Sequence, residues 1–180
     1  MNAIILYGSC YGTAKQYAEA LSERTGISCD EYTNLDRNKS YDLIIYVGAL
    51  YAGGVLGLAK TFRGYPEERC HRFLILTVGL ADPNDPVNRS NIRSALRGQL
   101  PAHIFESALL FHVRGGIDYH RLRPTHKAMM SLLYHVSKKT PSDKQDAETK
   151  AMIETYNQTV NFVDFESLNE AVKAIRCQAE

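Results

Sequence analysis

Four predominantly apolar runs divide the first two thirds of the chain. They cover residues 3–7, 43–47, 73–78 and 108–113, and they lack the strict alternation of a half-exposed strand. Such runs are typical of strands buried on both faces, which belong to parallel sheets covered by helices. A shorter and more polar run over residues 27–32 fits a strand at the edge of the same sheet.

Helical patterns lie between these runs. Apolar residues at i, i+3, i+4 and i+7 over residues 14–21 predict a first helix that ends at Gly26. Further helices are predicted over residues 57–62, 88–97 and 168–175. Ser167 and Glu170 have the spacing of a capping box for the last of these. The alternation predicts an α/β fold with a right-handed, doubly wound parallel sheet, in which a ligand lies beyond the carboxyl ends of the strands.

One segment, residues 115–162, exceeds a minimal five-stranded design; we call it the cap segment. Its sequence predicts a helix over residues 124–139 and, after Thr140 and Pro141, a second helix over residues 142–156. Its apolar side chains need the core to cover them. We therefore expect it to be an elaboration of a single domain that spans residues 1–180.

Length and composition agree with that organisation. The chain has 180 residues, 44% apolar and 23% charged, a balance that is typical of one globular domain. The 21 basic and 20 acidic side chains leave a formal net charge of +1. A whole-molecule field therefore does not attract nucleic acid or an anionic membrane, and a charged partner must meet a local patch.

The four cysteines, Cys10, Cys29, Cys70 and Cys177, form no C-x-x-C pair. This spacing indicates neither a disulfide scaffold nor a zinc site, and it is typical of a protein of the reducing cytoplasm. The apolar stretch at the N-terminus is too short for a signal sequence, and no apolar run approaches the ~20 residues that span a bilayer. We therefore expect a cytoplasmic protein without a metal site.

The first loop with candidate chemistry is GSCYGTA, residues 8–14, between the first strand and the first helix. Its hydroxyls, Ser9 and Thr13, and its backbone amides at a helix N-terminus favour an anion site. The dinucleotide pattern G-x-G-x-x-G is absent, and the nucleoside-triphosphate loop pattern fails because Gly8 and Gly12 are one residue too close. A mononucleotide cofactor phosphate fits best. Alternatively, Thr13 only caps the helix and Ser9 is a turn residue.

Two further loops follow the third and fourth strands. The second loop is GALYAGG, residues 48–54, where Tyr51 could stack on a flat heteroaromatic ring. The third loop is VGLADPNDPVNR, residues 78–89, which two prolines stiffen. A flexible loop with an exposed tyrosine and an ordinary connection are the respective alternatives. Because carboxyl ends of parallel strands meet at one sheet edge, we expect all three loops to converge.

These segments resemble flavodoxin-like FMN proteins, particularly the branch that includes the menaquinone-dependent protoporphyrinogen dehydrogenases. The first loop with its helix, the second loop with its strand, and LTVGLADP resemble the phosphate loop and the two flavin loops of that family. RGGIDYHRLRPTHKAMM and TVNFVDFESL are similar to the branch's segments after the last strand and before the closing helix. The resemblance runs over nearly the whole chain. It implies a flavodoxin-like five-stranded sheet with strand order 2-1-3-4-5 and helices on both faces.

The resemblance also implies the cofactor and its contacts. FMN would bind noncovalently, with its phosphate in the first loop and its isoalloxazine between the other two. The cofactor-binding residues implied are Ser9, Cys10, Tyr11, Gly12, Thr13 and Ala14 of the first loop, Ala49, Leu50, Tyr51, Ala52, Gly53 and Gly54 of the second, and Gly79, Leu80, Ala81 and Asp82 of the third. No side chain is assigned as a catalytic acid, base or nucleophile.

Residues 114–139 are basic and amphipathic. They contain six lysines or arginines against the single acid Asp118, interleaved with methionine, leucine and valine. Such a segment could dock a membrane surface, an anionic substrate such as a carboxylated tetrapyrrole, or an acidic redox partner. The alternative, which we favour at this stage, is a helix that covers the sheet with its apolar face and turns its lysines to water.

Three functional classes follow. The first is an electron-transfer protein that passes electrons through FMN to a redox partner protein or to a small acceptor such as a quinone. The second is an FMN-dependent oxidoreductase that acts on a quinone or a tetrapyrrole, with the cap segment shaping access. The third is a flavin-free binding module, a reading for which Ala14, at a position where a phosphate-contacting threonine is common, is the only hint.

Overall fold

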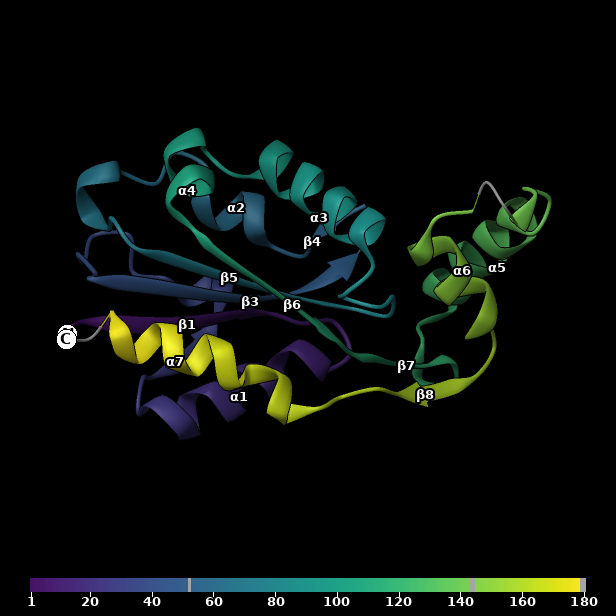
Figure 1. Ribbon diagram of the computed structural model, residues 1–180, viewed down its shortest axis with the longest axis horizontal. Coiled ribbons are helices and arrows are strands. Elements are labelled where there is room, and N and C mark those ends of the chain that lie inside the picture. Colours follow the sequence, from purple (N-terminus) through teal and green to yellow (C-terminus); the bar gives the residue numbers. More distant parts are fainter. Residues whose placement is uncertain (52, 143–144, 179–180) are drawn as a thin grey trace.

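The architecture is a parallel sheet between two layers of helices, with a smaller helical unit beyond one edge (Figure 1). The computed structural model describes residues 1–51, 53–142 and 145–178. The main sheet contains β1 (Ala3–Gly8), β2 (Cys29–Glu31), β3 (Leu43–Tyr51), β5 (Phe73–Gly79) and β6 (Leu109–Arg114), all parallel. Their spatial order is β2-β1-β3-β5-β6. Counted along these five strands the order is 2-1-3-4-5, so the predicted fold is confirmed.

The helices cover both faces of the sheet. On one face lie α1 (Thr13–Thr25) and α7 (Asn169–Cys177), and on the other lie α2 (Leu58–Phe62), α3 (Pro86–Gln99) and α4 (Ala102–Ser107). Alternate residues of each central strand serve the two layers. Ile45 packs in the core under α1 and α7, whereas its neighbours Ile44 and Tyr46 pack in the core under α2 and α3. Burial on both faces explains why these strands appear as continuous apolar runs.

Several elements differ from the sequence prediction. α3 extends through Gly98 to Gln99 and begins after Asp85, whose carboxylate accepts the Asn88 backbone N–H at 2.7 Å. α4 follows almost at once and was not predicted, because its six residues are too few to show a period. β3 continues to Tyr51, four residues beyond its apolar run, since the two-residue strand β4 (Gly54–Val55) folds back and pairs with it.

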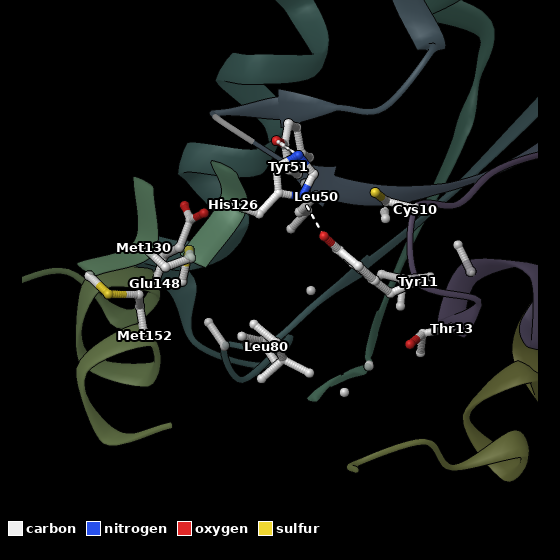
Figure 2. A pocket seen from close by; sticks show the side chains of 18 of the residues that line it. Cys10, Tyr11, Thr13, Leu50, Tyr51, Leu80, His126, Met130, Glu148 and Met152 are labelled. Carbon is white, nitrogen blue, oxygen red and sulfur yellow. Dashed lines mark hydrogen bonds between the residues drawn. The ribbon is translucent and has the colours of Figure 1, made fainter. Parts of the chain in front are cut away.

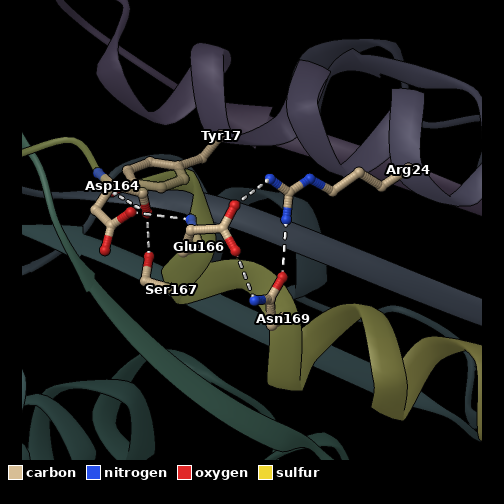
Figure 3. Close-up of polar contacts among 6 residues, drawn as sticks. All are labelled: Tyr17, Arg24, Asp164, Glu166, Ser167 and Asn169. Carbon is tan, nitrogen blue, oxygen red and sulfur yellow. Dashed lines mark hydrogen bonds and ion pairs between the residues drawn. The ribbon is translucent and has the colours of Figure 1, made fainter.

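The start of α7 is held by side chains rather than by the predicted capping box (Figure 3). Asp164 caps the preceding 3₁₀ turn, Phe165–Leu168, by accepting the backbone N–H of Glu166 at 3.0 Å. The Ser167 hydroxyl donates to the Asp164 carbonyl and so does not cap α7. Arg24 of α1 contacts both Glu166, at 3.6 Å, and Asn169, at 3.0 Å, which ties α7 to α1.

The cap segment lies beyond the carboxyl edge of the sheet (Figure 1). It begins with β7 (Gly116–Asp118), which pairs antiparallel with β8 (Thr159–Asn161), and between them come α5 (Pro124–Ser137) and α6 (Ala147–Glu154). α6 is shorter than the helix predicted over residues 142–156, because Asp146 caps its start by accepting the Thr149 backbone N–H and it ends before Thr155. Residues 143–144 of that prediction lie outside the described residues. Tyr134 of α5 stacks on Tyr156 with ring centroids 3.9 Å apart.

The prediction that a helix of the basic segment, residues 114–139, covers the sheet with its apolar face is wrong. α5 buries none of its residues, and Leu132, Leu133 and Val136 are 66%, 44% and 58% exposed. α1 and α7 already cover one face of the sheet, and α2, α3 and α4 cover the other. No face of the sheet is therefore left for α5 to cover. Within the described residues, no helix is both long and apolar enough to cross a bilayer.

Candidate functional site

The three predicted loops meet at the carboxyl ends of β1, β3 and β5. A cavity of about 590 Å³ opens between them and the α5–α6 pair of the cap segment (Figure 2). Its size lies in the range of ordinary small-molecule sites, and its walls are mainly apolar. This is the place where a doubly wound sheet binds its ligand, next to the point where the strand order reverses.

The first loop is shaped by Gly12. Its φ of +96° lies in the left-handed region that favours glycine, and its backbone N–H donates to the Ser9 hydroxyl at 3.0 Å. Gly12 is also the N-cap of α1, so Thr13 is the first helical residue and does not cap the helix with its side chain. The Thr13 side chain instead lines the cavity. The alternative in which Thr13 is only a cap is therefore excluded.

The start of α1 has unused hydrogen-bond donors. Within the described residues, the backbone amides of Thr13, Ala14 and Lys15 donate to no acceptor, as expected for the first turn of a helix. These amides and the positive end of the helix dipole adjoin the cavity wall that Ser9 and Thr13 form. An anion can take up these donors. No acidic side chain lies in the first turn to compete with it.

The second loop is flanked by paired residues of β3 and β4. Tyr51 pairs with Gly54 across it, and Leu50 pairs with Val55. A Cβ on Gly54 would come within 2.6 Å of the Gln99 side chain, so Gly54 faces α3 and not the cavity. The paired strands leave Ala49, Leu50 and Tyr51 at the cavity wall.

The third loop is held from two sides. The buried Asn88 side chain of α3 donates to the Asp82 carbonyl at 2.7 Å, and the Gly115 N–H donates to the Gly79 carbonyl at 2.7 Å. The Asp82 carboxylate accepts the Asn84 N–H at 2.8 Å and lies outside the cavity. Gly79, Leu80 and Ala81 line it. A Cβ on Gly115 would come within 2.7 Å of Val78, so that close approach requires glycine.

Twelve of the sixteen predicted residues line the same cavity. They are Ser9, Cys10, Tyr11, Thr13, Ala14, Ala49, Leu50, Tyr51, Gly53, Gly79, Leu80 and Ala81. Gly12, Gly54 and Asp82 belong to the three loops but do not line the cavity, and Ala52 lies outside the described residues.

The opposite wall was missed by the sequence prediction. It comes from the cap segment, and it consists of Gly115, Gly116, Ile117, Leu122, His126, Met129, Met130, Leu133, Ser137, Glu148, Thr149 and Met152. The sequence signal for this wall is the interleaving of methionine and leucine in α5. The same pattern also fits a helix that packs on the sheet, which is the interpretation that the sequence analysis favoured. Figure 2 shows Met130, Met152 and Glu148 on the α5–α6 side, facing the three loops across the cavity.

His126 joins two of the loops. Its Nδ1 is hydrogen-bonded to the Tyr11 hydroxyl, and its Nε2 lies 3.0 Å from the Tyr51 hydroxyl (Figure 2). The Tyr11 oxygen also accepts the backbone N–H of Arg123 at 3.3 Å. All three rings line the cavity, so a side chain of α5 completes a wall that Tyr11 and Tyr51 begin.

The electrostatics of the site are those of an apolar pocket with few charges. Burial raises the pKa of the Tyr11 hydroxyl, so Tyr11 stays neutral and can donate. Although Glu148 is accessible from the cavity, its apolar surroundings, followed by the charge of Asp146, raise its pKa. Among the described residues, no three histidine, cysteine, aspartate or glutamate side chains gather where they could hold a metal ion.

The six basic residues of positions 114–139 divide into two groups. Arg114 is structural, because its Nε donates to the Leu80 carbonyl at 3.0 Å and its guanidinium lies 3.8 Å from the centre of the Phe162 ring. Arg121, Arg123, Lys127, Lys138 and Lys139 have exposed side chains. Arg121 and Arg123 precede α5 and Lys127 lies in its first turn, close in sequence to the cavity residues Leu122 and His126.

Comparisons with known proteins identify the family of the chain. A family described as "Flavodoxin domain" matches residues 4–144. Two similar solved structures are a flavodoxin from the domain Archaea, with 12% identity over 64% of this chain and 85% of that chain, and a candidate flavoprotein from Bacteroides eggerthii, with 11% identity over 73% and 96%. Both have a TM-score of 0.42. No curated protein matches the chain. The family match includes all three loops and α5.

Proposed function

The chain belongs to the flavodoxin domain family, and from that premise we propose that it binds FMN noncovalently and transfers electrons through it. One observation carries the proposal: among the described residues, unpaired hydrogen-bond donors that suit an anion lie next to an apolar cavity, at the carboxyl edge of the sheet. The free amides of Thr13 and Ala14 adjoin the Ser9 hydroxyl, and the walls of Leu50, Tyr51 and Leu80 begin beside them. A phosphate and a flat ring need these two environments side by side.

The residues present fit the cofactor. Ser9, Thr13 and the amides of the first helical turn would hold the phosphate, because they offer donors and no competing acid. Gly12 leaves open space where another residue would have a Cβ. Bound FMN supplies one- and two-electron redox chemistry, and the protein supplies position and exclusion of water. Tyr51 would stack on the ring, and the backbone of residues 79–81 would meet its edge.

The direct test is to purify the protein, record its visible spectrum and identify any extracted flavin. We expect a yellow protein whose flavin is FMN and whose colour is bleached by reduction and restored by a one-electron acceptor. An apoprotein that binds no added flavin would contradict the proposal and would favour the flavin-free binding module.

A second candidate is favoured by the extent of the cavity. It continues beyond the three loops to Met129, Met130 and Met152, so an apolar reactant could lie between the cofactor and the α5–α6 pair. Such a cavity would suit an FMN-dependent oxidoreductase acting on a quinone or a tetrapyrrole, the second functional class that the sequence leaves open. A screen of quinones with and without protoporphyrinogen separates the classes. Turnover with a saturable small substrate favours the enzyme, and exchange with proteins alone favours the carrier.

A further inference from the structure

The link from His126 to Tyr11 and Tyr51 joins three segments that are far apart in the sequence. Tyr11 belongs to the first loop, Tyr51 ends β3, and His126 lies in the first turn of α5. The His126 ring meets Tyr11 edge-on, with centroids 5.7 Å apart and planes at 80°, and it meets Tyr51 at 5.5 Å and 48°. Both nitrogens of the imidazole are therefore used, one for each loop.

The two hydrogen bonds of His126 run in one of two directions, and the tautomer of the imidazole decides which. The Tyr11 oxygen accepts from Arg123, and its own hydrogen is free to donate to Nδ1 of His126. In that tautomer Nε2–H donates to the Tyr51 oxygen, and in the other tautomer both bonds are reversed. In either direction the link holds the side chain of Tyr51 by its hydroxyl end.

Tyr51 is the only aromatic residue that the second and third loops bring to the cavity, because the third loop presents Gly79, Leu80 and Ala81. Its orientation accordingly decides whether a ring stacks on the cofactor. α5 buries no residue of its own, so few packing forces hold it over the cavity. The hydrogen bonds of His126 can therefore both orient the Tyr51 ring and hold α5 over the cavity.

We propose that His126 is a positioning residue, which orients Tyr51 against the flavin ring and latches α5 over the cofactor. This rests on the proposed function for the flavin contact, but the latch itself concerns the protein alone. His126 orients Tyr51 through its hydroxyl, so removal of either partner should have the same consequence for the Tyr51 ring. Removal of both should add little further. His126→Ala also breaks the bond to Tyr11, so it should loosen α5 more than Tyr51→Phe does.

The experiment uses four single variants, one of them a control, and one double variant of the full chain. His126→Ala removes the bridge, Tyr51→Phe keeps the ring and removes its hydroxyl, and His126→Gln keeps a group that can both donate and accept. His135→Ala is the matched control, because His135 is exposed on the same helix, and it lines no part of the cavity. The double variant combines His126→Ala with Tyr51→Phe.

Two measurements are made. In the apoprotein, amide hydrogen exchange of residues 124–137 should rise most in His126→Ala and less in Tyr51→Phe, which keeps the His126–Tyr11 bond. It should stay at the parental level in His135→Ala and be partly restored in His126→Gln. In the loaded protein, FMN release should be roughly five- to tenfold faster in both His126→Ala and Tyr51→Phe, because each removes the hydrogen bond that orients Tyr51. The visible circular dichroism of the flavin should change with them, and the double variant should release FMN no more than about twofold faster than either.

Three results would overturn the proposal. They are unchanged exchange of α5 in apo His126→Ala, release rates that multiply in the double variant, and an equal effect of His135→Ala. Failure of the parent to bind FMN would contradict the proposed function instead, and the exchange of α5 in the apoprotein would still decide whether His126 is a latch.

Discussion

The buried side chain of Asn88 donates a hydrogen bond of 2.7 Å to the backbone carbonyl of Asp82, and this contact fastens the third loop to α3. Asn88 lines the cavity as well. The helix that Asp85 caps therefore also sets the position of the loop that the flavin ring would meet.

Asn88→Ala should lower the free energy of unfolding of the apoprotein by about 1–2 kcal/mol, because the Asp82 carbonyl loses its partner. It should also weaken FMN binding, since the third loop is no longer fixed. Asn84→Ala, at an exposed position in the same loop, is the control. Denaturant unfolding and FMN titration of both variants check this, and equal behaviour of the two would contradict the role of Asn88.

Gly12 and Gly26 flank α1 and provide a matched pair. Both have positive φ, +96° and +71°, and neither would place a Cβ within 4 Å of another atom. Changing either to alanine should cost about 1–2 kcal/mol of stability through the same backbone strain. Only Gly12→Ala should weaken FMN binding, because Gly12 lies in the first loop and Gly26 lies at the other end of the helix. Melting of apo and holo forms separates the effects. Equal losses of FMN affinity would show that Gly12 serves the fold alone.

His112 of β6 should make stability depend on pH. Its Nδ1 lies 2.7 Å from the Thr77 hydroxyl, and burial, followed by the charge of Arg89, lowers its pKa from 6.5 to about 4. Between these values the unfolded chain binds more protons than the native one, so stability falls as the pH drops from 6.5 towards 4. We expect a loss of about 1–2 kcal/mol between pH 7 and pH 5 that His112→Gln abolishes.

Denaturant unfolding at the two pH values checks this prediction. His71→Gln, at an exposed position, should keep the parental pH dependence. A pH dependence that survives in His112→Gln would assign it to other groups.

The exposed cations beside the cavity should act on encounter with an anionic partner. Neutralising Arg121, Arg123 and Lys127 to glutamine should slow electron transfer to an acidic acceptor at low salt and leave FMN affinity unchanged. The difference should shrink as salt rises, because surface charges are screened over ~8 Å at physiological ionic strength.

Stopped-flow reduction of an acidic acceptor across a salt series measures this effect. The control neutralises Lys39, Arg63 and Lys173, which are exposed and line no part of the cavity. Parental rates in the first triple variant at every salt concentration would show that the cations do not form a partner surface.

The strands were predictable from the sequence because each central strand is buried on both faces. Ile44, Ile45 and Tyr46 all meet core, and a run of this kind has few other interpretations. The place of the first loop at the cavity was predictable because it joins the first strand to the first helix at the carboxyl edge of the sheet. What the local pattern could not show was where a helix packs. Met129, Met130 and Leu133 suit a sheet face or a cavity wall equally well, and only the tertiary structure shows that the sheet faces are already covered.

His126 was missed for a related reason. A single histidine near a helix start carries no spacing signal, and its two partners, Tyr11 and Tyr51, lie 115 and 75 residues away in the sequence. Contacts of that range depend on the fold being known.

Titration of the apoprotein with FMN, riboflavin and FAD tests the central claim most directly. If the first loop holds the cofactor phosphate, FMN should bind at least tenfold more tightly than riboflavin, which lacks the phosphate and so makes none of the charge-assisted hydrogen bonds there. FAD should also bind much more weakly than FMN, since a phosphate that ends at residues 9–13 leaves no cradle for an adenylate. Comparable affinities for the three flavins would contradict the assignment of the first loop.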